Sequence, residues 1–167
     1  MEFHPKPITK DGIAAALQKA ERYRLINDPW SAESICLDVL TVEPESQQAL
    51  VTLLLAITDQ FPEAPTEGVR RAREVLPRLG DAYKRAYYAG IICERCAKAQ
   101  LMPGTFRSGE VPYHWIREAM TWYQKAEAQR PAGNDESLLR WNACVRLLAR
   151  HPHVRPRDDE PVELSLE

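Results

Sequence analysis

The chain has 167 residues, of which 44% are hydrophobic and 28% charged, with a net charge of −2 and a pI of about 6.1. These values are ordinary for a globular protein of one domain, and they exclude a mainly disordered chain. The near-neutral charge gives no long-range attraction to nucleic acid or to an anionic membrane, and no apolar run reaches the roughly 18 residues of a transmembrane helix. We therefore expect neither nucleic acid nor a membrane as a partner.

The first ten residues carry charges and two prolines but no apolar stretch, so residues 1–10 are interpreted as an N-terminal extension and not as a signal peptide. Without a secretory signal, four cysteines favour reduced thiols over a disulfide framework. A cytoplasmic protein is predicted.

Residues 11–150 are predicted to form one helical domain, because prolines and a few glycines separate apolar segments of helical spacing. Asp11 and Asp81 are expected to cap helix N-termini. Residues 102–112 are predicted to be a loop, and residues 151–167 an acidic, disordered tail. The predicted helices cover residues 11–26, 30–42, 45–61, 67–79, 81–101, 113–130 and 135–150, and no strand is expected.

An internal repeat links these helices. Ala20-x2-Tyr23 is followed by Ala32-x3-Cys36-x2-Val39-x4-Pro44, and the second part returns as Ala119-x3-Tyr123-x2-Ala126-x4-Pro131. Small residues let two helices approach closely, a large residue fills the space opposite, and proline ends the second helix. The pattern resembles that of the tetratricopeptide repeat family over roughly residues 11–150.

The resemblance implies an all-α fold: a right-handed superhelix of antiparallel helix hairpins, an irregular α-solenoid of about three units plus a capping helix. The sequence departs from the family pattern in each unit. Ala16 and Lys19 stand where larger apolar residues are preferred, and Leu54 stands where a small residue is usual. Extra residues precede the second helix of unit two, and residues 102–112 form an inserted loop in unit three. Ala86, Ala89 and Gly90 are all candidates for the small residue of the third unit, and Gly90 is favoured.

The resemblance also implies a concave groove lined by the first helix of each pair. Tyrosine and arginine dominate binding hot spots, and aliphatic residues between them would accept a helix or an extended peptide. We therefore predict a non-catalytic adaptor that binds another protein or peptide. The predicted groove residues are Leu17, Arg24, Val51, Leu55, Lys84, Tyr87, Tyr88, Ile91, Arg95, Arg140 and Arg146.

A more specific function of the family is disfavoured. Cochaperones of this kind clamp a C-terminal carboxylate with lysine, asparagine and arginine side chains. The equivalent positions here are Leu17, Glu21, Thr52, Lys84 and Tyr88, so only the lysine is kept.

Enzymatic chemistry and cofactors are not expected, since no nucleophile lies on a glycine-rich turn and no phosphate-binding loop is present. Cys93-x2-Cys96 places two thiols on one helical face, which would suit a thiol pair or half a metal site. Buried packing is the preferred interpretation, because free cysteine behaves as a small hydrophobe.

One alternative function is a structural subunit of a homodimer or larger assembly, with Trp30, Trp115 and Trp122 as interface residues. Residues 102–112 and the acidic tail are further candidate surfaces, the tail by docking into the groove or into a neighbour.

Overall fold

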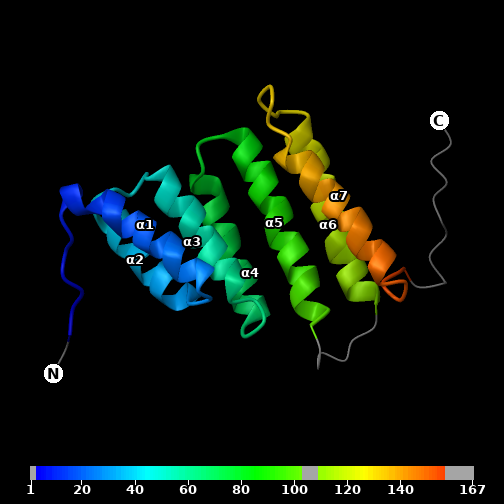
Figure 1. Ribbon diagram of the computed structural model, residues 1–167, viewed down its shortest axis with the longest axis horizontal. Coiled ribbons are helices and arrows are strands. Elements are labelled where there is room, and N and C mark those ends of the chain that lie inside the picture. The colour runs from blue at the N-terminus through cyan, green and yellow to red at the C-terminus, as the bar shows by residue number, and fades with distance from the viewer. Residues whose placement is uncertain (1–2, 103–108, 157–167) are drawn as a thin grey trace.

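The computed structural model describes residues 3–102 and 109–156, and these residues form an all-α structure without strands. None of the described helices combines the length and the apolar character that a membrane span requires. The helices follow one another across the molecule from the N-terminal to the C-terminal end (Figure 1). They are α1 (Ile13–Leu25), α2 (Pro29–Val42), α3 (Gln47–Asp59), α4 (Pro65–Val75), α5 (Ala82–Gln100), α6 (Glu110–Glu127) and α7 (Glu136–Arg150), with short 3-10 helices η1 (Lys10–Gly12) and η2 (Leu76–Arg78).

Side-chain caps begin three of the helices. Asp28 accepts a hydrogen bond of 3.1 Å from the backbone N–H of Ser31, and Asp81 accepts one of 2.8 Å from that of Tyr83. Ser46 caps α3 in the same way. The expected cap at Asp81 is confirmed, whereas Asp11 lies inside η1 and caps nothing.

Proline accounts for several of the differences between predicted and observed helix bounds, although not for the end of α6, which lies at Glu127 and not at the predicted residue 130. The loop expected over residues 62–66 ends early, because α4 begins at Pro65, where the missing N–H costs nothing in a first turn. Helix α6 likewise begins at Glu110 and holds Pro112 in its first turn, three residues before the predicted start. Pro77 lies in η2, which follows the end of α4 at Val75.

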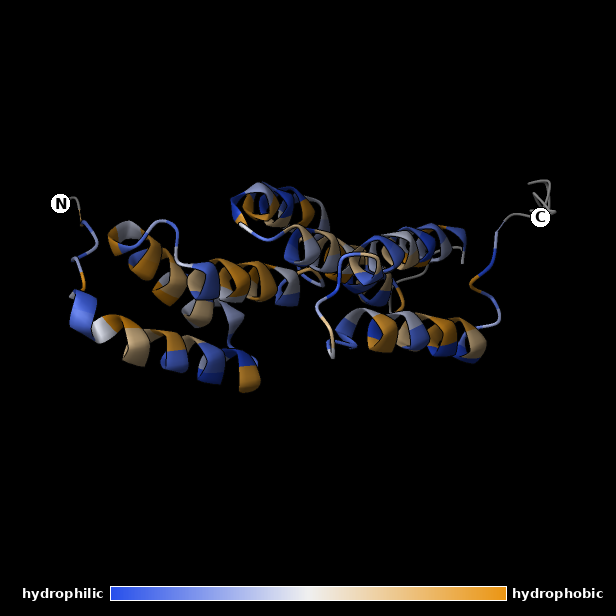
Figure 2. Cartoon of the chain, turned by 90° about the horizontal axis from the view of Figure 1, so that it is seen from above, coloured by the Kyte–Doolittle hydropathy of each residue, from blue (hydrophilic) through white to orange (hydrophobic). Residues whose placement is uncertain are grey.

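Each helix packs against the next one in the chain, and α1 also contacts α3, which in turn contacts α5. Ion pairs connect alternate helices on the other side: Arg71 of α4 with Glu33 of α2, and Arg73 of α4 with Glu118 of α6. Seen from above, α1 and α7 lie at the two ends of the molecule on the same side (Figure 2). Alternate helices therefore form two rows.

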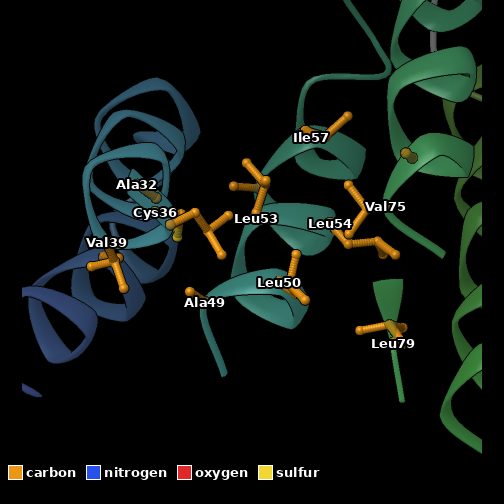
Figure 3. Close-up of a cluster of buried hydrophobic side chains, with 14 of the residues drawn as sticks. Ala32, Cys36, Val39, Ala49, Leu50, Leu53, Leu54, Ile57, Val75 and Leu79 are labelled. Carbon is orange, nitrogen blue, oxygen red and sulfur yellow. The ribbon is translucent and has the colours of Figure 1, made fainter. Parts of the chain in front are cut away.

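The largest core cluster joins α1 to α4 and extends to Ile92 and Cys96 of α5. Figure 3 shows side chains of α2, α3 and the α4–η2 segment meeting around α3, which is buried on most of its circumference. Cys36 and Val39 approach from α2, and Leu79 from beyond η2. A helix with apolar residues on nearly all sides is expected to lie between neighbours, as α3 does.

Helices α5 and α6 form the closest pair. A Cβ atom built on Gly90 would lie 2.5 Å from Cε1 of Tyr123, so only glycine permits this approach. The small position favoured from sequence, Gly90, thus faces the large position of the repeat, Tyr123. Ala119 and Ala126 on the same face of α6 are fully buried.

The packed body extends beyond the predicted boundary at Arg150. Val154 is 5% exposed and belongs to the core cluster shared by α5, α6 and α7, so the tail does not begin at residue 151. Most of the predicted loop and the rest of the predicted tail, residues 103–108 and 157–167, lie outside the described residues.

Candidate binding groove

A groove of about 630 Å³ lies on the row formed by α1, α3 and α5. The C-terminal end of α1, the part of α3 from Gln47 to Leu55 and the first two turns of α5 contribute its walls. The caps at Ser46 and Asp81 set where α3 and α5 begin, and so which of their residues reach the groove. The lining residues are Glu21, Arg24, Leu25, Gln47, Gln48, Val51, Thr52, Leu55, Lys84 and Tyr88.

The floor of the groove is apolar. Val51 and Leu55 are four residues apart on α3 and half-buried, and Tyr88 of α5 packs beside them. Leu25 extends this surface outward with 85% of its area exposed. Burial raises the pKa of the Tyr88 phenol to about 12, so its hydroxyl is a hydrogen-bond donor at physiological pH.

The rim of the groove carries charged and amide side chains. Lys84 is half-buried, and no described residue forms an ion pair or hydrogen bond with its ammonium group. Glu21 accepts a 3.4 Å hydrogen bond from Gln48 across the α1–α3 boundary. An unpaired ammonium group beside aliphatic side chains favours a ligand with both a carboxylate and apolar groups.

Arg24, which lines the groove, shares one carboxylate with Arg95, which lies behind it. Arg24 Nε lies 2.7 Å from Oδ2 of Asp59, and Arg95 Nη1 binds Oδ1 of the same residue. Arg95 also donates to the hydroxyl of Thr58 at 2.8 Å. Burial lowers the pKa of Arg95, whereas Asp59 opposes that shift. Arg24, Asp59 and Arg95 together keep one excess positive charge next to the groove.

Five of the eleven predicted groove residues line the observed groove: Arg24, Val51, Leu55, Lys84 and Tyr88. Leu17 and Ile91 are 4% and 2% exposed and belong to the core, so their prediction as surface residues was wrong. Both lie on helices with neighbours on two sides, which bury a wider part of the circumference than one pairing would.

The remaining predicted residues lie apart from the groove lining. Tyr87 stacks with Tyr83, with ring centroids 5.9 Å apart, and contacts Tyr88 and Tyr123. Arg140 of α7 reaches Glu94 at 3.4 Å, while Arg146 is exposed on α7. Arg95 lies behind the groove in its ion pair. These side chains hold helices together or face solvent elsewhere.

The sequence interpretation missed Leu25, Gln47 and Gln48. Gln47 and Gln48 directly follow Ser46, which caps α3. Recognising Ser46 as an N-cap in the sequence would have placed both glutamines in the first turn of that helix. Leu25 is the last residue of α1, so the helical spacing of apolar residues does not indicate what surrounds it.

Cys93 and Cys96 are buried, as are Cys36 and Cys144, and all four are free thiols. Burial raises the pKa of Cys93 strongly and that of Cys96 to about 12. Such thiols are poor nucleophiles and poor metal ligands. Among the described residues, no group of three or more His, Cys, Asp or Glu side chains is arranged to hold a metal ion.

Comparison with protein-family models, with curated proteins and with solved structures gave no match to this chain.

Proposed function

We propose that this protein is a non-catalytic adaptor that binds a peptide segment of another protein in the groove of α1, α3 and α5. The observation that carries the proposal is the composition of that groove: an apolar floor of Val51 and Leu55 beside the unpaired Lys84 and the half-buried Tyr88. Apolar floors with a few polar groups at the rim are typical of peptide-binding grooves.

The arrangement of small and large residues supports a tetratricopeptide-like array as the framework. Gly90 against Tyr123 and the buried Ala20, Ala32 and Ala119 correspond to the close-packing positions of the repeat. In this proposal, α1 with α2, α3 with α4 and α5 with α6 are three hairpins of a short solenoid, and α7 is its capping helix. A cytoplasmic location belongs to the same proposal.

The absence of catalysis is part of the proposal and is supported by the groove lining. Within the described residues, that lining includes no serine, cysteine or histidine, so it offers no pairing of a nucleophile with an imidazole base. Its titratable side chains are Glu21, Arg24, Lys84 and Tyr88, which suit hydrogen bonding and charge recognition.

A library of random peptides displayed on phage tests this proposal against the full chain. Peptides that bind should lose about ten-fold in affinity with Val51→Asp or Lys84→Glu, because one removes apolar contact and the other reverses the rim charge. Leu37→Asp and Lys6→Glu make the same changes at exposed positions outside the groove and should leave affinity unchanged. If the peptides bind all four variants equally, the groove is not their binding site.

A structural subunit is the second candidate function, and one surface favours it. Three apolar side chains at the α1–α2 turn are exposed to solvent: Leu25 by 85%, Ile26 by 71% and Trp30 by 56%. Exposed apolar patches of this kind mark contacts with other proteins. Light scattering separates the two functions: a monomer at micromolar concentration argues against self-assembly, and a dimer lost in Ile26→Asp and Trp30→Ala would support it.

A further inference from the structure

Charge is divided unevenly along this chain. Residues 157–167, which lie outside the described residues, contain five carboxylate side chains and one arginine, a net charge of −4. The whole chain carries −2, which leaves +2 for residues 1–156. At the groove, the unpaired Lys84 and the excess charge of Arg24 and Arg95 over Asp59 outweigh the one lining carboxylate, Glu21, which leaves a net charge of +1 there. The two parts of the chain therefore attract each other.

The acidic segment also has an apolar pattern. Val162, Leu164 and Leu166 alternate with Glu163, Ser165 and Glu167. In an extended backbone, alternate side chains point to the same side, so the three aliphatic residues would share one face. An extended peptide with one apolar face and flanking carboxylates matches the aliphatic floor at Val51 and Leu55 and the ammonium group of Lys84.

The length of the segment suffices to reach the groove of its own molecule. Val154 packs against Gly109, just before α6 begins, whereas Lys84 lies near the start of α5 and Gly90 of α5 lies against Tyr123 of α6. At 1.5 Å per residue, from Gly109 to Tyr123 on α6 and from Gly90 to Lys84 on α5, these two levels lie about 30 Å apart along the helix axes. An extended chain spans about 33 Å from Val154 to Leu164 and about 40 Å from Val154 to Leu166. The end of the segment, with Leu164 and Leu166, can therefore reach the groove when the chain runs back along α5.

We propose that residues 157–167 occupy the groove of their own molecule as an extended segment. Leu164 and Leu166 lie on Val51 and Leu55, and the carboxylates of the segment lie near Lys84 and Arg24. This inference rests on the proposed function, since it requires the groove to accept a peptide. It adds a regulatory property: a partner peptide must displace the chain's own segment before it binds.

Photo-crosslinking in the full-length chain tests the contact directly. A photoreactive amino acid replaces Leu164, and the cross-linked residues are identified by mass spectrometry. We expect cross-links within one molecule to α3 near Val51 and to α5 near Tyr88. Their yield should fall about five-fold in Lys84→Glu and at high salt, because the attraction is largely electrostatic. Lys6→Glu, the same charge change on the exposed N-terminal extension, should leave the yield unchanged.

Three results would overturn the inference: no cross-link, cross-links to other surfaces, or cross-links mainly between two molecules, which would make the occupant a second copy. A second measurement separates this inference from the proposed function. Neutralising Asp158, Asp159 and Glu160 as Asn, Asn and Gln should tighten the binding of library peptides to the groove about five-fold. If library peptides bind the unaltered chain and this variant equally, the self-occupied groove is rejected and the proposed function is not. If neither chain binds peptides in the groove, both proposals are rejected.

Discussion

The hydroxyl of Tyr123 on α6 donates a hydrogen bond of 2.6 Å to the carboxylate of Glu94 on α5, which is 1% exposed. Lys98 pairs with the same carboxylate from one turn further along α5, and Arg140 reaches it from α7 at 3.4 Å. One buried charge thus joins three helices. A buried carboxylate is tolerated only when such partners satisfy it.

Tyr123→Phe is expected to lower the free energy of unfolding by about 1–3 kcal/mol, because it leaves one oxygen of Glu94 without a donor in the core. Urea unfolding followed by circular dichroism measures the change. Tyr113→Phe is the matched control, since that half-buried ring on α6 has no hydrogen bond from its hydroxyl to a described residue. An equal loss in both variants would show that the hydrogen bond to Glu94 contributes little.

Gly90→Ala should destabilise the protein by about 1–3 kcal/mol, because the added methyl group would lie 2.5 Å from the ring of Tyr123. The hydrogen bond to Glu94 holds that ring in place, so it cannot move aside without a further loss. Gly80→Ala serves as the control, since its Cβ would meet only Gln47 Oε1 at 3.9 Å. A stabilising Gly90→Ala, as expected from helix propensity alone, would contradict the close approach of α5 and α6.

The helices could be predicted from sequence because each is marked by local signals. Helical spacing of apolar residues, together with the prolines at the ends of the apolar segments, predicted all seven helices of the described residues. The expected cap at Asp81 lies directly before α5. The turn between α1 and α2 shows the limit of that approach. The predicted helices leave residues 27–29 as a gap without a defined conformation, whereas Asn27 adopts a φ of 60° and Asp28 caps α2.

The groove could be predicted only in part, because helical spacing places residues on a face but does not say what covers that face. Val51 and Leu55 are four residues apart on α3, and Lys84 and Tyr88 are four residues apart on α5. Each pair lies on one face of its helix and lines the groove, as this spacing predicts. Arg95 has similar spacing on α5, yet Asp59, 36 residues earlier, pairs with it behind the groove. No local pattern indicates such a long-range partner.

Lys84 and Arg95, both predicted for the groove, are therefore expected to respond differently to mutation. Arg95→Ala should destabilise the protein by about 1–3 kcal/mol, because it removes a mostly buried partner of Asp59 and of Thr58. Lys84→Ala should change stability by less than about 0.5 kcal/mol, since it breaks no hydrogen bond or ion pair with a described residue. Thermal unfolding of both variants measures the difference. Equal destabilisation would mean that Lys84 has a structural role and is unsuitable as a probe of binding.

The four thiols should react slowly with a disulfide reagent at pH 8 in the native protein and rapidly in denaturant. The thiolate is the reactive form, and burial raises the pKa of Cys36, Cys96 and Cys144 from 9.0 to about 12. One thiol that reacts within seconds in the native state would contradict the buried positions.

The same thiols predict how stability depends on pH. Their pKa is higher in the folded than in the unfolded chain, so the folded state binds more protons between these two values. This contribution is fully present below about pH 9 and is lost as the pH rises toward 12. The urea midpoint should therefore fall over that interval. Replacing Cys96 with alanine should make the fall less steep, although it lowers stability at neutral pH by removing a buried side chain. An unchanged slope would show that the Cys96 thiol ionises alike in the folded and unfolded states.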